Sequence, residues 1–196
     1  VEAVGQGVDA ALLGTRVAAP LFVSKRPHSG YAEQVTIDVD LAVPLPDALS
    51  FEDATALMVQ GLTALHLLRQ SSPEEKSVLV PAAAGGVGSL LVQLARLKGA
   101  SKVVAAAGGR AKLDHVLSLG ADSAIDYSQP DWPARVRDVT GGEGADIIYD
   151  TVGGALTAAA LQALAPGGEL VFAALGRFAL VASDVEAMIG RNQSLR

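Results

Sequence analysis

Apolar residues in the second half of the chain follow two alternating patterns. Short, mostly apolar runs, typical of strands buried on both faces, occur at residues 78–80, 103–107, 123–127, 145–149 and 169–175. Stretches with apolar residues at helical spacing lie between and after these runs, at residues 87–98, 111–119, 131–140, 156–164 and 184–189. This alternation predicts an α/β fold, a doubly wound parallel sheet with helices on both faces. Ligands of such sheets bind beyond the carboxyl ends of the strands.

The first part of the chain carries weaker signals. Two strands are expected, at residues 15–19 and 32–37, with a polar loop between them at residues 24–30. A segment of this length cannot bury a core alone, so we expect it to be the remnant of a β domain.

Two prolines mark the boundary between the two parts. After Pro44 and Pro46, Ser50 is expected to cap a helix that runs to residues 71–73. We therefore expect a partial β segment over residues 1–45 and the strand–helix domain over residues 46–196.

Composition excludes several classes of site. The formal net charge of -6 argues against nucleic acid or an anionic membrane surface as a partner. The chain contains no cysteine, which excludes disulfides and Cys-ligated zinc within it and fits a cytoplasmic protein. Residues 77–95 are uncharged, but Pro81 and the Gly85–Gly86 pair interrupt them, so a buried strand, turn and helix explain them better than a membrane span.

The strongest chemical signal is the turn after the first apolar strand. It reads Ala83-Ala84-Gly85-Gly86-Val87-Gly88 and leads directly into an apolar helix. In a Rossmann dinucleotide-binding sheet, small residues here let the backbone approach the pyrophosphate and let helix and strand pack closely. The free N–H groups at the start of the helix then face the phosphates. The turn predicts that a nicotinamide dinucleotide binds; the alternative is a tight structural turn.

The second turn favours NADPH over NADH. An NAD-binding protein would carry Asp or Glu about twenty residues past the glycines, to hold the ribose 2'-hydroxyl. Here the strand ends in alanines and Gly108–Gly109, and Arg110 and Lys112 follow. Cations beside a glycine turn suit a 2'-phosphate; the alternative is two solvated charges at a helix start.

Several motifs together resemble the medium-chain dehydrogenase/reductase superfamily. They are Val59-Gln60-Gly61-Leu62-Thr63-Ala64, the glycine turn, Leu119-Gly120-Ala121-Asp122, Ile125-Asp126-Tyr127 and Tyr149-Asp150-Thr151-Val152-Gly153. The resemblance is strongest to the zinc-independent quinone oxidoreductase, or zeta-crystallin, branch and covers essentially the whole chain. It implies that residues 14–33 correspond to the second half of a GroES-like catalytic domain. It also implies a fragment that lacks the first half of that domain and ends before the sixth Rossmann strand.

The resemblance also implies roles for individual residues. Gly85, Gly86, Val87 and Gly88 match the pyrophosphate loop, and Gly108, Arg110 and Lys112 match the 2'-phosphate turn. Further cofactor contacts are expected from Thr63, His66, Tyr127, Val152, Ala174, Leu175 and Gly176. His66 could equally be a satisfied core histidine.

Zinc and residue-based catalysis find little support in the sequence. Zinc-dependent members of the superfamily place a cysteine ligand four residues before the equivalent of Thr63, and this position is Val59. Strand-end carboxylates such as Asp126, Asp146 and Asp150 lack metal-ligand spacing and are interpreted as structural. No residue of the chain is a strong acid–base candidate, so catalytic residues are not assigned and no metal is expected.

The resemblance implies an NADPH-dependent reductase that transfers hydride to a small-molecule acceptor. A quinone is the family default, and another electron-poor carbonyl such as an enone is nearly as well supported. The alternatives are an enoylreductase domain of a polyketide synthase and a non-catalytic, crystallin-like NADPH-binding protein. Relatives often form homodimers through the sheet edge, which this sequence leaves open.

Overall fold

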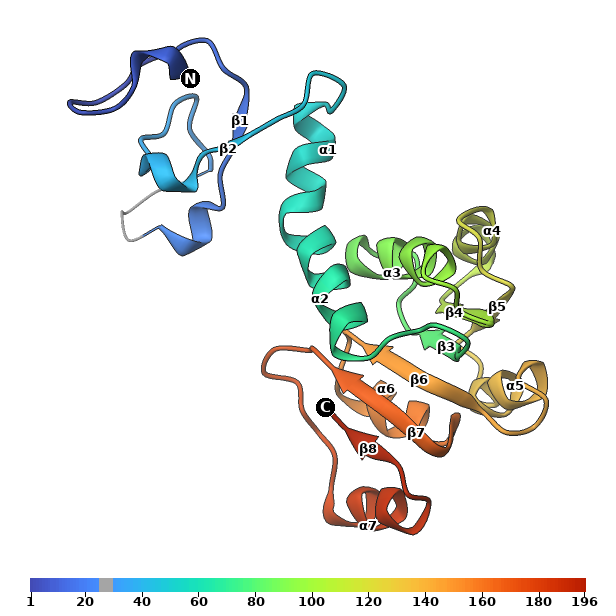
Figure 1. Ribbon diagram of the computed structural model, residues 1–196. Helices are drawn as coiled ribbons and strands as arrows, with labels where there is room; N and C mark the ends of the chain where they lie inside the picture. Colours follow the sequence, from blue (N-terminus) through green and yellow to red (C-terminus); the bar gives the residue numbers. More distant parts are fainter. Residues whose placement is uncertain (25–29) are drawn as a thin grey trace. The chain divides into compact units, whose positions relative to one another are not determined.

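The computed structural model describes residues 1–24 and 30–196, and within them the apolar runs form one six-stranded parallel sheet (Figure 1). Its strands are β3 (Ser77–Val80), β4 (Lys102–Ala107), β5 (Ser123–Asp126), β6 (Ala145–Asp150), β7 (Leu164–Phe172) and β8 (Ser194–Leu195). Their order is β5-β4-β3-β6-β7-β8, and every neighbouring pair is parallel. The predicted fold class is confirmed: the chain winds outward from β3 in one direction and from β6 in the other.

Helices cover both faces of this sheet, as predicted. One face is packed against α2 (Leu62–Gln70), α3 (Gly86–Leu97) and α4 (Arg110–Ser118). The other face is packed against α5 (Trp132–Val139), α6 (Ala155–Leu161) and α7 (Ala182–Gly190). Successive strand residues pack into the cores on opposite faces of the sheet. Val78 and Val80 belong to the core under α2, α3 and α4, and Leu79 belongs to the core under α5, α6 and α7. This is why the strands read as continuous apolar runs rather than alternating ones.

The end of the sheet differs from the prediction in two ways. β7 begins at Leu164, where a helix was expected to end. The sixth strand was expected to follow Arg196, and this is wrong: Ser194 and Leu195 already pair with β7, and the Arg196 N–H donates to the Leu170 carbonyl at 2.9 Å. The strand escaped detection because its two exposed residues, Ser194 and Leu195, form no apolar run.

The chain divides into two compact units, Val1–Leu62 and Thr63–Arg196. The domain boundary expected between residues 45 and 46 stays a prediction. Most of the polar loop expected at residues 24–30 lies outside the described residues. The helix expected from Ser50 is present, since the Ser50 hydroxyl accepts a hydrogen bond from the Asp53 N–H at 2.9 Å and α1 spans Phe51–Ala56.

The first unit contains one small antiparallel sheet among its described residues. Its strands are β1 (Val17–Ala18) and β2 (Val43–Pro44). A short 3-10 helix at Ala10–Leu12 precedes β1, and two more, at Leu21–Val23 and Val39–Leu41, lie between the two strands. The strand predicted at residues 32–37 is wrong, because an extended segment becomes a strand only where a partner strand pairs with it. Pro44, expected to mark the boundary, is also a strand residue paired with Val17, which an edge position allows because the missing N–H of proline is not needed there.

Arg16 ties the end of this unit together. Its guanidinium donates hydrogen bonds to the carbonyl oxygens of Pro46 (3.0 Å), Asp47 (3.2 Å) and Leu49 (2.6 Å). It also lies over the Phe51 ring, 4.5 Å from the ring centre. One side chain therefore fixes the segment that leads into α1.

The long helix contains a π-helical turn that the sequence pattern did not predict. Leu57–Gly61 form this turn between α1 and α2. A π turn inserts one extra residue per turn and often occurs near functional sites. Here it ends two residues before Thr63, which is expected to contact the cofactor.

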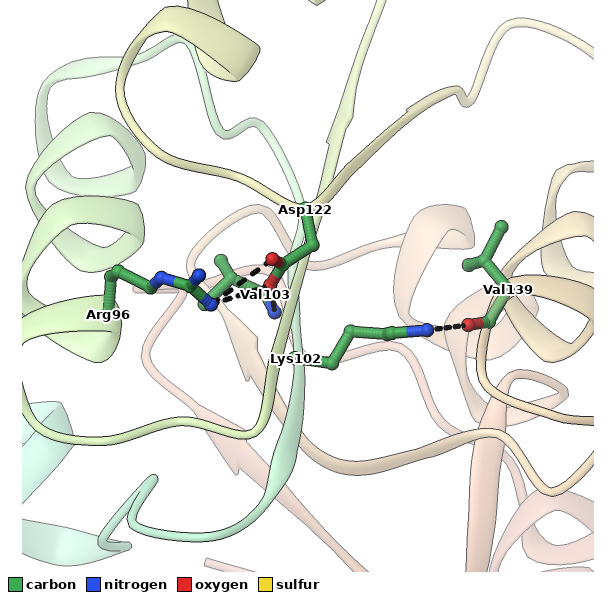
Figure 2. A network of polar contacts seen from close by, with 5 residues as sticks. All are labelled: Arg96, Lys102, Val103, Asp122 and Val139. Carbon is green, nitrogen blue, oxygen red and sulfur yellow. Dashed lines mark hydrogen bonds and ion pairs between the residues drawn. The ribbon is translucent and has the colours of Figure 1, made fainter.

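Polar side chains at the amino ends of the strands hold neighbouring segments together (Figure 2). The Asp122 carboxylate accepts a hydrogen bond from the Val103 N–H at 2.7 Å and pairs with Arg96 at 3.1 Å. Lys102 donates to the Val139 carbonyl at 2.5 Å. These groups satisfy one another and the backbone, so this edge of the sheet is structural.

Tyr149 on β6 anchors the carboxyl end of α2. Its ring is fully buried, and its hydroxyl donates to the carbonyl of the buried Ser71 at 2.6 Å. Burial, with a smaller contribution from the Glu169 carboxylate, raises the pKa of Tyr149 above its usual value. The hydroxyl therefore stays protonated and remains a donor at neutral pH.

Tyr149→Phe should lower the free energy of unfolding at pH 7 by about 1–3 kcal/mol, because the buried Ser71 carbonyl loses its donor. Urea titration of both proteins measures this difference. The matched control is Tyr127→Phe, which removes a half-buried hydroxyl and should cost no more than about 0.5 kcal/mol.

The same pair of proteins tests the direction of the pKa shift. The wild type keeps Tyr149 protonated when folded and ionises it near pH 10 when unfolded, so this contribution is fully present below about pH 10 and is lost as the pH rises further. The Tyr149→Phe variant has no such group, so the stability gap should narrow from about pH 9 to pH 11. A gap that stayed constant across this range would contradict a raised pKa for Tyr149.

Candidate dinucleotide-binding site

The glycine turn joins β3 to α3 through a very close backbone contact. A Cβ on Gly88 would lie 2.4 Å from the Ala82 carbonyl oxygen and 2.7 Å from the Ala83 Cα, which no side chain allows. Ala82 itself takes a left-handed conformation with φ 48°. The buried Ala83 donates its N–H to the Ala106 carbonyl of β4 at 3.0 Å, which fixes the turn to the next strand. The structure therefore explains both the small residues and their spacing.

The start of α3 offers an open set of backbone donors. Gly85, at the N-cap, and Gly86 are exposed, and no acidic side chain occupies the first turn. The first N–H groups of a helix have no partner within the helix, and they carry the positive end of its dipole. A Cβ on Gly85 would lie 3.2 Å from the Ala82 oxygen, so the turn has little room for a larger residue. This arrangement fits a pyrophosphate group.

The second turn lies between β4 and α4. Gly109 has φ 85°, and a Cβ on Gly108 would lie 3.4 Å from the Tyr127 ring. Tyr127 therefore packs directly beside the predicted 2'-phosphate turn.

The two cations of this turn differ in their surroundings. Arg110 is exposed and pairs through Nε with Asp114 at 3.1 Å, which leaves both terminal nitrogens of the guanidinium free of that ion pair. Lys112 is exposed and forms no ion pair within the part of the chain that the structure describes. Both side chains are available to an anion, and Lys112 has no competing carboxylate.

Asp126, at the end of β5, adds a negative charge near the same turn. Hydrogen bonds from Ser128 (its hydroxyl and its N–H), a weaker one from the Gly109 N–H and the charge of Arg135 lower the pKa of Asp126. The carboxylate is thus ionised at neutral pH. Its hydrogen bonds with Ser128 fit the structural interpretation of this residue, which stays a prediction.

Two further loops follow the carboxyl ends of β6 and β7. Val152 is half-buried, Ala174 is buried, and Leu175 is almost fully exposed. Gly176 has φ 66°, which turns the chain back towards α7. Arg177 was not among the predicted residues; it is exposed, and its Nη2 lies 3.4 Å from the position of a Cβ on Gly154.

Helix α2 carries the last two predicted contacts. Thr63 is half-buried and His66 is exposed, with the Gln70 amide nitrogen 3.3 Å from its Nε2. The alternative of a core histidine is therefore wrong, because the ring lies at the surface of its own unit. A cofactor contact by His66 or Thr63 stays a prediction.

Most predicted site residues share one edge of the sheet. The segments Gly85–Gly88, Gly108–Lys112, Tyr127, Val152 and Ala174–Gly176 follow the carboxyl ends of β3, β4, β5, β6 and β7 in turn (Figure 1). This edge includes the point between β3 and β6 where the strand order reverses, the usual ligand position in such sheets. Sequence reasoning took Asp150 for a structural strand-end carboxylate and missed its hydrogen bonds with the Val152 and Gly153 N–H groups, although its place three residues before Gly153 was a usable signal.

No three His, Asp or Glu side chains in residues 1–24 and 30–196 lie close enough together to hold a metal ion. None of the helices in the described ranges combines the length and apolar character that a membrane span requires.

Related proteins share this arrangement. The sequence profile of the zinc-binding dehydrogenase family matches residues 86–196. The chain is 36% identical over 174 residues to a quinone oxidoreductase of Salmonella typhimurium, covering 87% of this chain and 51% of the relative. It is 33% identical over 192 residues to a 2-haloacrylate reductase of Burkholderia sp, covering 96% of this chain and 56% of the relative. The chain thus spans about half the length of these curated relatives.

Solved structures agree with the sequence comparison. The quinone oxidoreductase of Pseudomonas syringae superposes with a TM-score of 0.83 at 34% identity, covering 100% of this chain and 59% of the other. The Escherichia coli quinone oxidoreductase complexed with NADPH superposes with a TM-score of 0.82 at 30% identity, with the same two coverages. The chain therefore belongs to the zinc-binding dehydrogenase family and, within the medium-chain dehydrogenase/reductase superfamily, to its quinone oxidoreductase-like branch.

Proposed function

We propose that this protein is an NADPH-dependent, zinc-independent reductase that acts on a quinone or another electron-poor carbonyl acceptor. The observation that carries the proposal is the turn between β3 and α3, where Gly88 admits no Cβ and the helix start exposes its backbone donors. The NADPH complex of the Escherichia coli relative supports this cofactor. When bound, the nicotinamide supplies the hydride, so the chain's own residues bind and orient the reactants.

Each turn of the carboxyl edge has a separate part in holding the dinucleotide. The N–H groups at the start of α3 would bind the pyrophosphate. Arg110 and Lys112 would bind the 2'-phosphate, with Gly108 giving close access and Tyr127 packing beside it. Val152 and the backbone of Ala174–Gly176 would line the remaining length of the cofactor, and Thr63 and His66 would contact it from α2.

The acceptor class follows from chemistry that the relatives share. Quinones and haloacrylates, which the names of the two relatives contain, both present an electron-poor carbon to a hydride donor. A polyketide synthase subunit of Mycobacterium tuberculosis is 34% identical over 174 residues, covering 87% of this chain and 8% of the subunit, so an enoyl thioester remains the alternative acceptor. Cytoplasmic location and a homodimer remain predictions from the sequence.

Gly85→Ala should weaken NADPH binding by about tenfold, because the added methyl group stands between the backbone and the pyrophosphate. Titration of the protein with NADPH, followed by the fluorescence of the cofactor, measures the change. The matched control is Gly190→Ala, where a Cβ meets nothing within 4 Å and binding should not change. Equal affinity of the two variants would argue against a pyrophosphate at this turn.

Lys112→Ala and Arg110→Ala should each weaken NADPH binding by about tenfold and leave NADH binding unchanged, because only NADPH carries the 2'-phosphate. The ratio of the two affinities, measured by calorimetry, is the deciding quantity. Lys76→Ala removes an exposed cation at the amino end of β3 and should leave the ratio unchanged. An unchanged ratio in the Lys112 and Arg110 variants would show that these cations do not bind the 2'-phosphate.

Oxidation of NADPH by the protein should be measured with 1,4-benzoquinone, an enone and an enoyl thioester. We expect turnover with the quinone or the enone, and an unchanged rate after treatment with a chelator, because the reductase needs no zinc. Turnover with the thioester alone would favour the enoylreductase alternative. Tight NADPH binding without turnover of any acceptor would overturn the proposed reductase activity and favour the alternative of a non-catalytic NADPH-binding protein.

A further inference from the structure

A fully buried carboxylate lies at the carboxyl end of β6. The Asp150 Oδ1 accepts hydrogen bonds from the N–H groups of Val152 (2.8 Å) and Gly153 (3.0 Å), and its Oδ2 accepts one from the Thr157 hydroxyl. A buried charge is costly unless several donors satisfy it, and here three donors do so. Because the group has no exposed surface, it can act only through the segments that it holds.

The loop held by this carboxylate is bonded to the loop after β7. The Asp150 carbonyl accepts from the Ala173 N–H, and the Gly154 N–H donates to the Arg177 carbonyl, both at 2.8 Å. A Cβ on Gly153 would lie 2.7 Å from the Arg177 Cβ and 2.9 Å from the Ala174 Cβ. The two backbones are therefore in direct contact.

The conformation of the first loop depends on its two glycines and on the carboxylate together. Gly153 and Gly154 have φ of 74° and 67°, a region that other residues avoid. Glycines can also adopt many other conformations, so they do not fix the loop by themselves. The hydrogen bonds from the Val152 and Gly153 N–H groups to Asp150 hold the loop in the observed conformation. Without the carboxylate, the contact with residues 174–177 would lose its support.

We propose that Asp150 is a positioning residue: it joins the loop after β6 (residues 151–154) and the loop after β7 (residues 173–177) into one rigid platform for the dinucleotide. This inference rests on the proposed function, because residues of both loops, Val152 and Ala174–Gly176, are the ones proposed to line the cofactor. The carboxylate touches neither cofactor nor acceptor and acts only by fixing these backbones before binding.

The same strand offers a matched control. Asp146, at the amino end of β6, accepts hydrogen bonds from the N–H (2.7 Å) and the hydroxyl (2.8 Å) of Ser77. Like Asp150, it combines backbone and hydroxyl donors on one carboxylate, but it is half-buried and has one backbone donor where Asp150 has two. It lies at the structural edge of the sheet, away from both loops.

The experiment compares Asp150→Ala with Asp146→Ala by NADPH affinity and by amide hydrogen exchange without cofactor. Asp150→Ala should raise the Kd for NADPH and speed exchange in both residues 151–154 and residues 173–177, each by about tenfold or more. Asp146→Ala should lower thermal stability but change neither the Kd for NADPH nor the rate of exchange in these two loops. Asp150→Asn keeps an acceptor oxygen for the two N–H groups, so it should stay within about threefold of the wild type and remains informative if the Ala variant does not fold.

Several results would overturn the inference. Unchanged exchange of residues 173–177 in Asp150→Ala would show that the loops are not coupled, whatever the NADPH affinity. If Asp150→Ala exchanged faster in these loops but bound NADPH as tightly as Asp146→Ala, Asp150 would be merely structural. If Asp150→Asn and Asp150→Ala lost equal NADPH affinity, the hydrogen bonds to Oδ1 would be excluded as the cause. If the wild type bound no NADPH, the proposed function and the role towards the dinucleotide would both fall, and the exchange of residues 173–177 would still decide the coupling.

Discussion

The contact between Gly88 and the backbone of Ala82 and Ala83 is the constraint on which the candidate site depends. Because no Cβ separates them, the first turn of α3 lies directly on the chain that leaves β3. The helix then starts at the carboxyl edge of the sheet, with its unpaired N–H groups and the positive end of its dipole at that edge. A larger residue at Gly88 would force the helix away from the strand and remove the donors from the position where a phosphate would be bound.

The remaining turns of this edge use the same means, backbone fixed by glycine and by buried hydrogen bonds. Gly109 allows the sharp entry into α4, and the Tyr127 ring fills the space beside Gly108. After β6, the buried Asp150 carboxylate accepts hydrogen bonds from backbone N–H groups, as a capping side chain does at an ordinary helix start. This edge is thus built mainly from main chain, and Arg110 and Lys112 carry the charges that we propose distinguish NADPH from NADH.

The two edges of the sheet differ in how their polar groups are satisfied. At the amino edge, Asp122 and Asp146 satisfy backbone and side-chain donors of neighbouring segments, as Figure 2 shows for Asp122. At the carboxyl edge, backbone donors of α3 are left without partners inside their helix. This asymmetry arises because strands and helices alternate in a parallel sheet, so every helix on either face begins at the same edge.

The pattern of residues along the chain was enough to predict the parallel sheet apart from β8, its helices and the glycine turn. Strands buried on both faces must be continuously apolar, and a helix that touches a strand must carry glycine at the contact. Buried strands and the glycine turn can therefore both be recognised from the types of residue along a short stretch of chain. Tertiary structure alone decided the pairing of Ser194 and Leu195 with β7, the replacement of the expected strand at residues 32–37 by Val43 and Pro44, and the exposure of His66. It also decided that Asp150 holds two loops at once. Strand pairing and side-chain burial depend on which distant segment of the chain lies beside a residue. The local pattern of apolar and polar residues does not specify that segment.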